Sequence, residues 1–505
     1  MFYPKKLITK KVGTYKLNFT AFSNLMNTEI DEGLLPHKTA KISYNYKIAN
    51  GALSTGIGFE PMTLPKTLTD PNNERQVYME QNDGIKKLWH YRFFNQDTNL
   101  PQHMIMFYTV GGQIWWALVV HEVDPYVYKI NSQGVLYPNG IPNAVNYRLD
   151  GEDWMIFSSP KDGMWKYRKD YGATQIENGP CITSMCVHYE RIFAIIEGER
   201  TRLSFSANLD PTNWNENLDE GGFIDMIDDR GKLNKVVSFN DYVYVFRDFG
   251  VARVSAYGDQ STFSVSQLFM SSSMIYGESV CVCGQKIMLL ARDGIYSFDG
   301  YTMTKLQLGI EKLFEGIKND NCSAVFYNGK YYLALKLDFK DDEKIGCEDY
   351  SEGYTNNALI EIDIKTNEVE IYRGIDICSM LMIDDGNICK LLACFNGEHK
   401  QKIGQMTNDG CIFGTPLKKV WKSPKSNMGY PSKLKRIREM FVKSKYDCKI
   451  KLTSEKESKT YVVKASNKTE RIKTNVSGEQ IEVEFVSQDG GAYITCPQIV
   501  VEVTA

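Results

Sequence analysis

The residues Val236-Val-Ser-Phe-Asn-Asp-Tyr-Val-Tyr-Val-Phe246 form two apolar runs around a central Asn-Asp pair. Asn and Asp tolerate the positive φ of a tight turn, so such a pair between two apolar runs predicts a β-hairpin. Three further turn pairs stand just before aromatic runs, at Asp162-Gly163, Asp293-Gly294 and Asn328-Gly329. The pattern indicates antiparallel hairpins as the repeating unit of the chain.

The spacing of these turn pairs favours a β-propeller. Successive pairs lie 78, 53 and 35 residues apart, and the mean is close to the roughly 40–50 residues of a four-stranded blade. A single sandwich domain would run to only about 100 residues. We therefore predict an all-β fold whose body, residues 61–415, is an irregular β-propeller of about six blades.

Two regions flank this body and differ from it. Residues 1–60 are polar with scattered apolar positions, and we expect an extended N-terminal arm that contributes to the first blade. Residues 416–505 alternate between apolar and polar side chains, which predicts a C-terminal β-sandwich. Its expected strands are Lys449–Thr453, Lys459–Lys464, Gln480–Phe485 and Gln498–Val503. The turn formers between Lys422 and Pro431 place the predicted domain boundary there, so that residues 420–505 would fold separately.

Composition further limits the class of protein to which the chain can belong. The chain has 505 residues, 12% aromatic side chains and a net charge of −3, so it carries no nucleic-acid signature as a whole. The opening residues have no apolar segment of the secretory type. The longest apolar stretch, Met104–Val120, is interrupted at Gly111-Gly112, so we expect a hairpin there and no membrane-spanning segment. Residues 310–317 form one short stretch with helical spacing.

A search for chemistry finds no catalytic motif. The chain has no phosphate-binding loop, nucleophile elbow or zinc-protease motif, and its six His residues, at 37, 90, 103, 121, 188 and 399, are far apart. Cys281 and Cys283 are too few ligands for a structural zinc. The acidic stretches 225–229 and 341–343 lack the pattern of a calcium loop. We therefore predict a protein that is not an enzyme, with no catalytic, cofactor-binding or metal-binding residues.

One region resembles a known family. Residues 187–253 carry Arg202-Leu-Ser-Phe-Ser206, then Asp210-Pro-Thr-Asn-Trp214, then Gly222-Phe-Ile-Asp225 and the hairpin quoted above. This order resembles the head-to-tail stabilisation proteins and tail nozzles of short-tailed bacteriophages. The resemblance covers about 350 residues loosely, beginning at Asn50-Gly-Ala-Leu53. The large nozzles are longer than this chain, so a connecting or capping subunit fits better than the distal nozzle.

The resemblance implies a virion structural protein, made in the cytoplasm of the bacterial host. It implies a homo-oligomeric ring around the DNA channel, with a hexamer favoured, and contacts with other tail proteins such as an adaptor, a fibre or a nozzle. Passive contact with genomic DNA in the channel is a further expectation. The alternative is a tail-tip propeller that binds or depolymerises host glycans, which a cleft with two close carboxylates and exposed aromatics would favour. A cytoplasmic ligand-binding propeller unrelated to phage is a third reading.

The strongest local charge lies just after the predicted propeller. Residues 414–451 hold twelve Lys and Arg against two acidic side chains, a net charge of +10. Alternate residues of a strand share one face, so we predict a basic interface. Its residues are Lys433, Lys435, Arg436, Arg438, Lys443 and Lys445. The expected partner is acidic: a neighbouring subunit's propeller, the adjoining tail ring or DNA. A solvated face remains the plainer alternative.

Overall fold

The computed structural model describes residues 12–18, 22, 26–30, 35, 39–62, 67–69, 76–78, 84–96, 99–118, 127–131, 135–217, 220–339, 353–384, 386 and 389–504. These residues form strands, turns and short 3-10 segments, and none of them is in an α-helix. The acidic stretch 341–343, His37, His121 and residues 1–11 lie outside the described residues. The expected helix at 310–317 is a single 3-10 turn, η4 (Glu311–Phe314), whose Leu313 and Phe314 are buried. The apolar residues of this stretch face the core from one side, which gives them helical spacing. A single turn is enough to bring them there.

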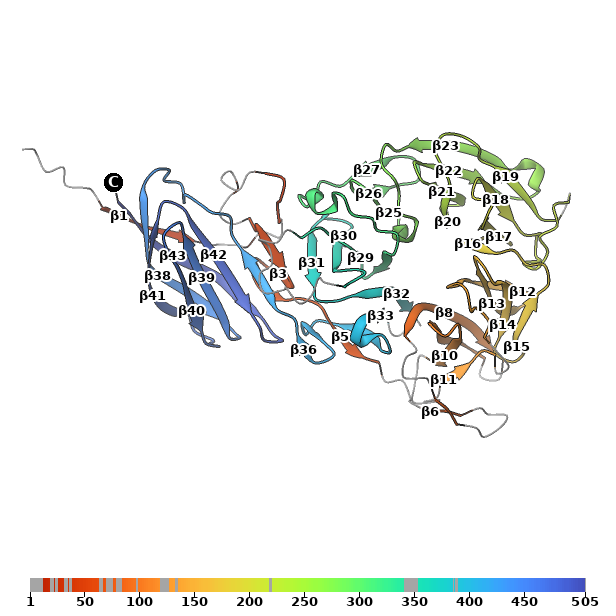
Figure 1. Cartoon of the computed structure of the whole chain (residues 1–505), viewed down its shortest axis with the longest axis horizontal. Coiled ribbons are helices and arrows are strands. Elements are labelled where there is room, and N and C mark those ends of the chain that lie inside the picture. The colour runs from red at the N-terminus through yellow and green to blue at the C-terminus, as the bar shows by residue number, and fades with distance from the viewer. Residues whose placement is uncertain are drawn as a thin grey trace, which may run out of the picture.

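The body is a β-propeller (Figure 1). The described residues form seven blades, one more than the spacing of the turn pairs predicts: six are four-stranded antiparallel sheets, and the seventh is part of a six-stranded sheet. The first strand of each blade lies innermost (Figure 1), and around most of the ring these first strands pack beside those of the neighbouring blades. The first four blades are β8–β11 (Ile85–Asn95, Leu100–Thr109, Ile114–Leu118, Val127–Lys129), β12–β15 (Asn143–Leu149, Glu152–Ser159, Gly163–Arg168, Gly172–Ile176), β16–β19 (Ile182–His188, Arg191–Ile196, Arg202–Phe205, Gly222–Asp225) and β20–β23 (Leu233–Phe239, Tyr242–Arg247, Gly250–Ser255, Ser264–Met270).

The last three blades complete the ring. They are β24–β27 (Cys281–Cys283, Lys286–Ala291, Gly294–Phe298, Met303–Lys305), β28–β31 (Ser323–Tyr327, Lys330–Leu335, Ala358–Asp363, Val369–Arg373) and β32–β34 (Ile377–Asp384, Cys389–Phe395, Ile403–Thr407) with β5 (Gly58–Pro61) as the outer strand. A short extension, β35 (Cys411–Ile412) and β36 (Thr415–Pro416), follows β5 in the same sheet, and β6 (Thr67–Thr69) pairs with β7 (Gln76–Tyr78).

The turn pairs occupy two different positions in the blades, which explains the uneven spacing. Asn240-Asp241 and Asn328-Gly329 join the first and second strands of blades 4 and 6, whereas Asp162-Gly163 and Asp293-Gly294 join the second and third strands of blades 2 and 5. Pairs in equivalent positions are 88 residues apart over two blades and 131 apart over three. Both intervals give about 44 residues a blade.

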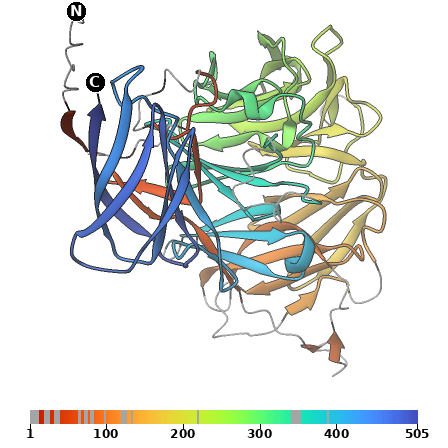
Figure 2. The same ribbon diagram turned by 60° about the vertical axis from the view of Figure 1, so that its left-hand side comes forward.

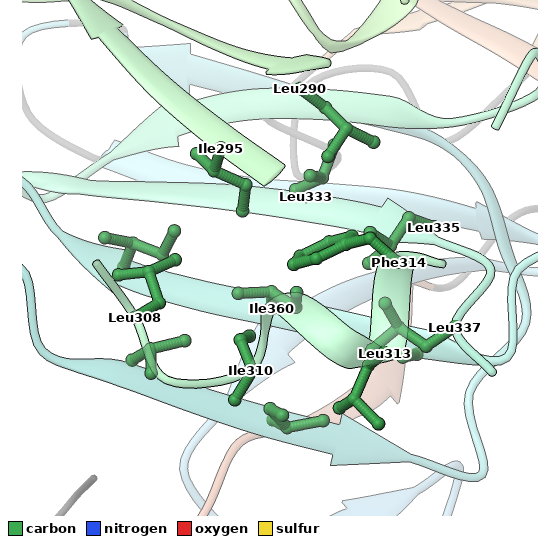
Figure 3. Packing of buried hydrophobic residues seen from close by; sticks show 14 of the residues in the cluster. Leu290, Ile295, Leu308, Ile310, Leu313, Phe314, Leu333, Leu335, Leu337 and Ile360 are labelled. Carbon is green, nitrogen blue, oxygen red and sulfur yellow. The ribbon is translucent and has the colours of Figure 1, made fainter. Parts of the chain in front are cut away.

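Apolar side chains fill the space between neighbouring blades. Figure 3 shows the cluster between blades 5 and 6, where Leu290 and Ile295 meet Leu333, Leu335 and Ile360. Equivalent clusters join the other neighbouring pairs of blades, including blades 7 and 1 through Leu392 and Phe107. Burial of each such side chain contributes about 1.5–3 kcal/mol, so the ring is held mainly by these interblade cores.

A β-sandwich lies beside blade 6 (Figures 1 and 2). Its first sheet contains β3 (Tyr46–Ala49), β4 (Ala52–Thr55), β43 (Tyr493–Thr504), β38 (Leu434–Ser444) and β41 (Glu470–Gly478), with β1 (Val12–Asn18) paired to β43. Its second sheet contains β2 (Ile42–Tyr44), β37 (Lys419–Lys422), β42 (Ile481–Ser487), β39 (Cys448–Ser454) and β40 (Ser458–Val463). The four strands expected from the alternation are confirmed as parts of β39, β40, β42 and β43.

The N-terminal segment ties the two parts together, which corrects the expectation that it contributes to the first blade. Strands β1 to β4 belong to the sandwich, and β5 closes the seventh blade by pairing with β34. Sheet edges expose unpaired N–H and C=O groups. Residues 377–407 supply only three strands to the seventh blade, and β5 pairs with the outermost of them, β34. The predicted joint at 422–431 is also not a linker, because Ser423 N donates to Val483 O and Ser426 pairs with Ile481.

Candidate functional site

The predicted basic interface lies on strand β38 and the residues just before and after it, but its residues do not share one surface. Lys435 is fully buried, on the same side of the strand as Ile437, and its Nζ donates to Glu479 O at 2.6 Å. Burial lowers the pKa of Lys435. The neighbouring Lys433 and Leu434 are exposed. Lys435 is therefore part of the sandwich interior, and the expectation that Lys433 and Lys435 line one docking face is wrong.

Other basic residues of the 414–451 region are also engaged inside the fold. Lys419 is buried and donates to Asp489 O at 2.8 Å, and burial lowers its pKa to about 8. Lys422 pairs with Glu482 at 3.0 Å. Lys445 is exposed, and its Nζ lies over the Tyr493 ring at 4.3 Å. The net charge of +10 in the sequence is thus divided among interior, interdomain and surface positions.

A genuine basic surface forms on the outward side of the first sandwich sheet. We call it the basic face; its described charged residues are Arg436, Arg438, Lys443, Arg471 and Lys473, together with the acidic Glu439 and Glu502. Alternation from the buried Lys435 and Ile437 points Arg438 outward, where its Nε lies 2.7 Å from Glu502, and a bulge between Ile437 and Glu439 points Glu439 outward as well. Arg471 pairs with Glu439, and these two ion pairs leave a net charge of +3. Sequence reasoning missed Arg471 and Lys473, which lie on β41 and reach the face only through its pairing with β38.

The mouth of the propeller channel carries a second polar site. At the end where the innermost strands begin, a cavity of about 470 Å³ is lined by Lys86, Lys87, Asn143, Glu278, Cys378 and Asn396. Glu278 accepts from Lys87 at 3.3 Å and from Lys235 at 3.1 Å, so it links blades 1 and 4. The two ammonium groups hold the pKa of Glu278 well below its usual range. No motif marks this site, since Lys87, Lys235 and Glu278 are distant in sequence.

A second cavity lies near the other end of the innermost strands. It has a volume of about 520 Å³ and is lined by His90, Arg92, Phe93, Phe94, Pro101, Asn146, Tyr147, Arg148, Asp153 and Asp384. His90 Nε2 lies 2.8 Å from His103 Nδ1, so the fold brings together two histidines that the sequence separates. Asp153 accepts from Phe94 N at 2.8 Å. The cavity thus combines two carboxylates with Phe94, whose side chain is 41% exposed.

The residues that carry the phage-tail resemblance lie in blade 3 and serve structural contacts. Ser206 Oγ accepts from Ile192 N at 3.0 Å, and Asp210 Oδ1 accepts from Thr212 N at 2.9 Å to form the turn. Trp214 Nε1 donates to Pro211 O at 3.1 Å. The Trp214 ring packs against the cluster between blades 2 and 3, as expected for an apolar residue that closes a blade.

The described residues do not form a metal site or an activated nucleophile. They contain no group of three or more His, Cys, Asp or Glu side chains placed to hold a metal ion. Cys283 is buried and its Sγ contacts Cys281 O at 3.5 Å. His188 is buried with Nδ1 2.8 Å from Ser238 Oγ, and burial lowers its pKa. In the part of the chain that the structure describes, no helix has the length and apolar character to cross a bilayer.

Comparisons with known proteins assign the chain to no family. No family model matches the chain, and no curated protein matches its sequence. Among solved structures, it is similar to BBS1N in a complex with ARL6DN, with 8% identity, a TM-score of 0.40, and coverage of 68% of this chain and 97% of that chain. It is also similar to the Pan2 WD40 domain of Neurospora crassa, with 8% identity, a TM-score of 0.36, and coverage of 65% and 90%. Neither similarity bears on function.

Proposed function

We propose that this protein is a non-enzymatic structural component of a bacteriophage tail, a connector subunit that assembles with copies of itself around the DNA channel. The observation that carries the proposal is the position of the residues shared with tail proteins. Ser206, Asp210 and Trp214 form the closing turn of a blade, which is a scaffold role that needs no substrate. Localisation in the virion and contacts with neighbouring tail proteins belong to the same proposal.

The build of the molecule supports this role. Lys47 of β3 pairs with Glu361 of blade 6 at 3.2 Å, and Asn45 Oδ1 accepts from Arg373 N at 2.8 Å. Because the chain crosses between the two parts twice through short connections, residues 56–57 and 417–418, the sandwich and the propeller are tethered at two points. A connector in a tail must transmit load without deforming, and a chain tied in this way suits that demand.

The proposal is tested on purified particles. Mass spectrometry of intact virions should find this chain in multiple copies, and electron microscopy should place propeller and sandwich density in a ring of the tail. An antibody against the sandwich should label tails and not capsids. Particles of normal tail structure that lack the chain would contradict the proposal.

A second candidate is glycan binding at the tail tip, favoured by the 520 Å³ cavity with Asp153, Asp384 and the exposed Phe94. Aromatic faces and carboxylates are common in carbohydrate sites. Under this alternative, incubation with host envelope polysaccharide would give binding or release of reducing ends. Both would disappear in a D153N/D384N variant. The structural proposal expects no binding and no release.

A further inference from the structure

We infer that the basic face of one copy docks on an acidic rim of blade 3 in the next copy, so that subunits associate head to tail. This inference rests on the proposed function, because a ring requires repeated contacts between copies. It goes beyond that function by assigning both surfaces and their residues.

The acidic rim is a cluster of carboxylates around one guanidinium. Arg202 lies 2.9 Å from Asp225, 3.7 Å from Glu216 and 3.8 Å from Glu199. Three carboxylates around a single cation leave a net charge of −2. Exposed Glu197 and Asp229 add to it from the adjoining turns.

The rim also presents apolar surface. Ile227 is 78% exposed, and the exposed ring of Phe223 stacks under the Arg202 guanidinium at 3.6 Å. The basic face offers a half-buried apolar counterpart in Phe441. Burial of apolar surface between the copies supplies affinity that exposed ion pairs alone do not give.

The charge of the whole chain is distributed in the same way, with excess positive charge in the sandwich and excess negative charge in the propeller. Residues 419–505 hold 17 Lys and Arg against 10 Asp and Glu, a net charge of +7. Residues 56–418 hold 34 against 49, a net charge of −15. Such a division attracts the sandwich of one copy to the propeller of another, and it accelerates and orients their encounter.

The two surfaces lie at opposite ends of the molecule. In Figure 1 the sandwich strands β38, β41 and β43 are at one end of the long axis, and β18 and β19 of blade 3 are at the other; Figure 2 agrees. A copy therefore cannot satisfy its own basic face. Contacts between two different surfaces are heterologous, and they produce a closed ring when the rotation between neighbours closes, or an open chain when it does not.

The test uses charge reversal on each side separately. In the face variant, Arg436, Lys443 and Lys473 are each changed to Glu. In the rim variant, Glu199, Glu216 and Asp225 are each changed to Lys. Lys435 stays, because it is buried. A control variant changes Lys318, Lys365 and Lys402 to Glu, which gives the same change of net charge as the face variant at exposed propeller positions away from both surfaces.

Assembly of the full-length chain is measured by analytical ultracentrifugation in 50 and 500 mM NaCl, with circular dichroism to verify folding. The wild type and the control should form species larger than a dimer at low salt, and high salt should shift them toward monomer. Each variant alone should remain monomeric. A mixture of the two variants should assemble beyond a dimer, because the native rim of the face variant meets the native face of the rim variant, and the two reversed surfaces are also complementary. One chain with all six changes should assemble again.

The inference is overturned if the wild type stays monomeric at low salt and high concentration, or if the face and rim variants assemble like the control. It is also overturned if the mixture of folded variants gives only monomers. These outcomes are separate from the test of the proposed function, because a protein found in tail rings whose assembly ignores the six changes would retain its function and lose this contact.

Discussion

Glu370 lies where the sandwich meets blade 6, and its carboxyl group shares a hydroxyl donor with Glu361. Tyr372 Oη lies 2.8 Å from Glu370 Oε2 and 3.0 Å from Glu361 Oε2, and Ile48 N donates to Glu370 Oε1 at 3.2 Å. Burial, together with the Glu361 charge, raises the pKa of Glu370 to about 7. The folded state therefore binds an extra proton between the ordinary pKa and about 7, so this group destabilises the fold as pH rises through that window.

Glu370→Gln should remove that pH dependence, because glutamine resembles the protonated carboxyl. We expect the stability of the variant relative to wild type to increase by about 1–3 kcal/mol between pH 4.5 and pH 8. Urea unfolding at both pH values measures it. Glu368→Gln, at an exposed turn position close by, is the control and should follow wild type. Equal pH dependence in E370Q and wild type would show that Glu370 titrates normally.

Glu278 serves a different purpose, since it joins two lysines from blades that are not neighbours. The side chains are about one-quarter to one-third exposed, so each pair should contribute only about 0.5–1 kcal/mol. A double-mutant cycle with Glu278→Gln and Lys87→Met should give a coupling free energy of that size, decreasing at 1 M NaCl. Strictly additive effects at low salt would mean that the ion pair contributes nothing to stability.

At the scale of elements, the seventh blade depends on a strand from the other end of the chain. Phe59 of β5 is buried and meets the Phe395 ring with centroids 5.3 Å apart. Phe59→Ala should destabilise the protein by about 3–5 kcal/mol. Hydrogen exchange should rise first in β34, whose partner is lost. Phe94→Ala, at a partly exposed ring, should change stability by less than about 0.5 kcal/mol. Unchanged protection of β34 in F59A would contradict the closing role of β5.

The sequence predicts elements wherever the signal is local. Turn pairs such as Asn240-Asp241 and alternation such as that of β39 depend on a few neighbouring residues, so the hairpins and the all-β class follow from them. Closure of the seventh blade joins Gly58–Pro61 to Ile403–Thr407, and no local pattern names a partner so distant. Lys435 is a different case. Its position two residues before the core residue Ile437 already places it inward, but the surrounding run of lysines gave the opposite expectation.

The whole molecule is two folded units that share one N-terminal segment. Residues 419–505 lack the sandwich strands β1 to β4, and so they would leave part of the core uncovered. Phe22, Tyr46 and Leu53 all belong to the sandwich core, and the Phe22 ring lies 4.9 Å from that of Trp421. A fragment without them would expose both this apolar surface and an unpaired edge of β43.

We therefore expect residues 419–505 alone to remain unfolded or to aggregate, and a permuted chain to fold. Val12 pairs with Thr504 in the register of β1 and β43, so a short Gly-Ser linker can join the C-terminus to residues 12–55. The permuted chain should show cooperative thermal unfolding and dispersed amide signals in NMR. A control in which a polar segment of equal length replaces residues 12–55 should behave like the bare fragment. Cooperative unfolding of residues 419–505 by themselves would mean that the sandwich is an independent domain and that the N-terminal segment only decorates it. If the permuted chain alone folds, residues 12–55 are a structural part of the sandwich, and because β5 follows them after two residues, they also connect the sandwich to the seventh blade.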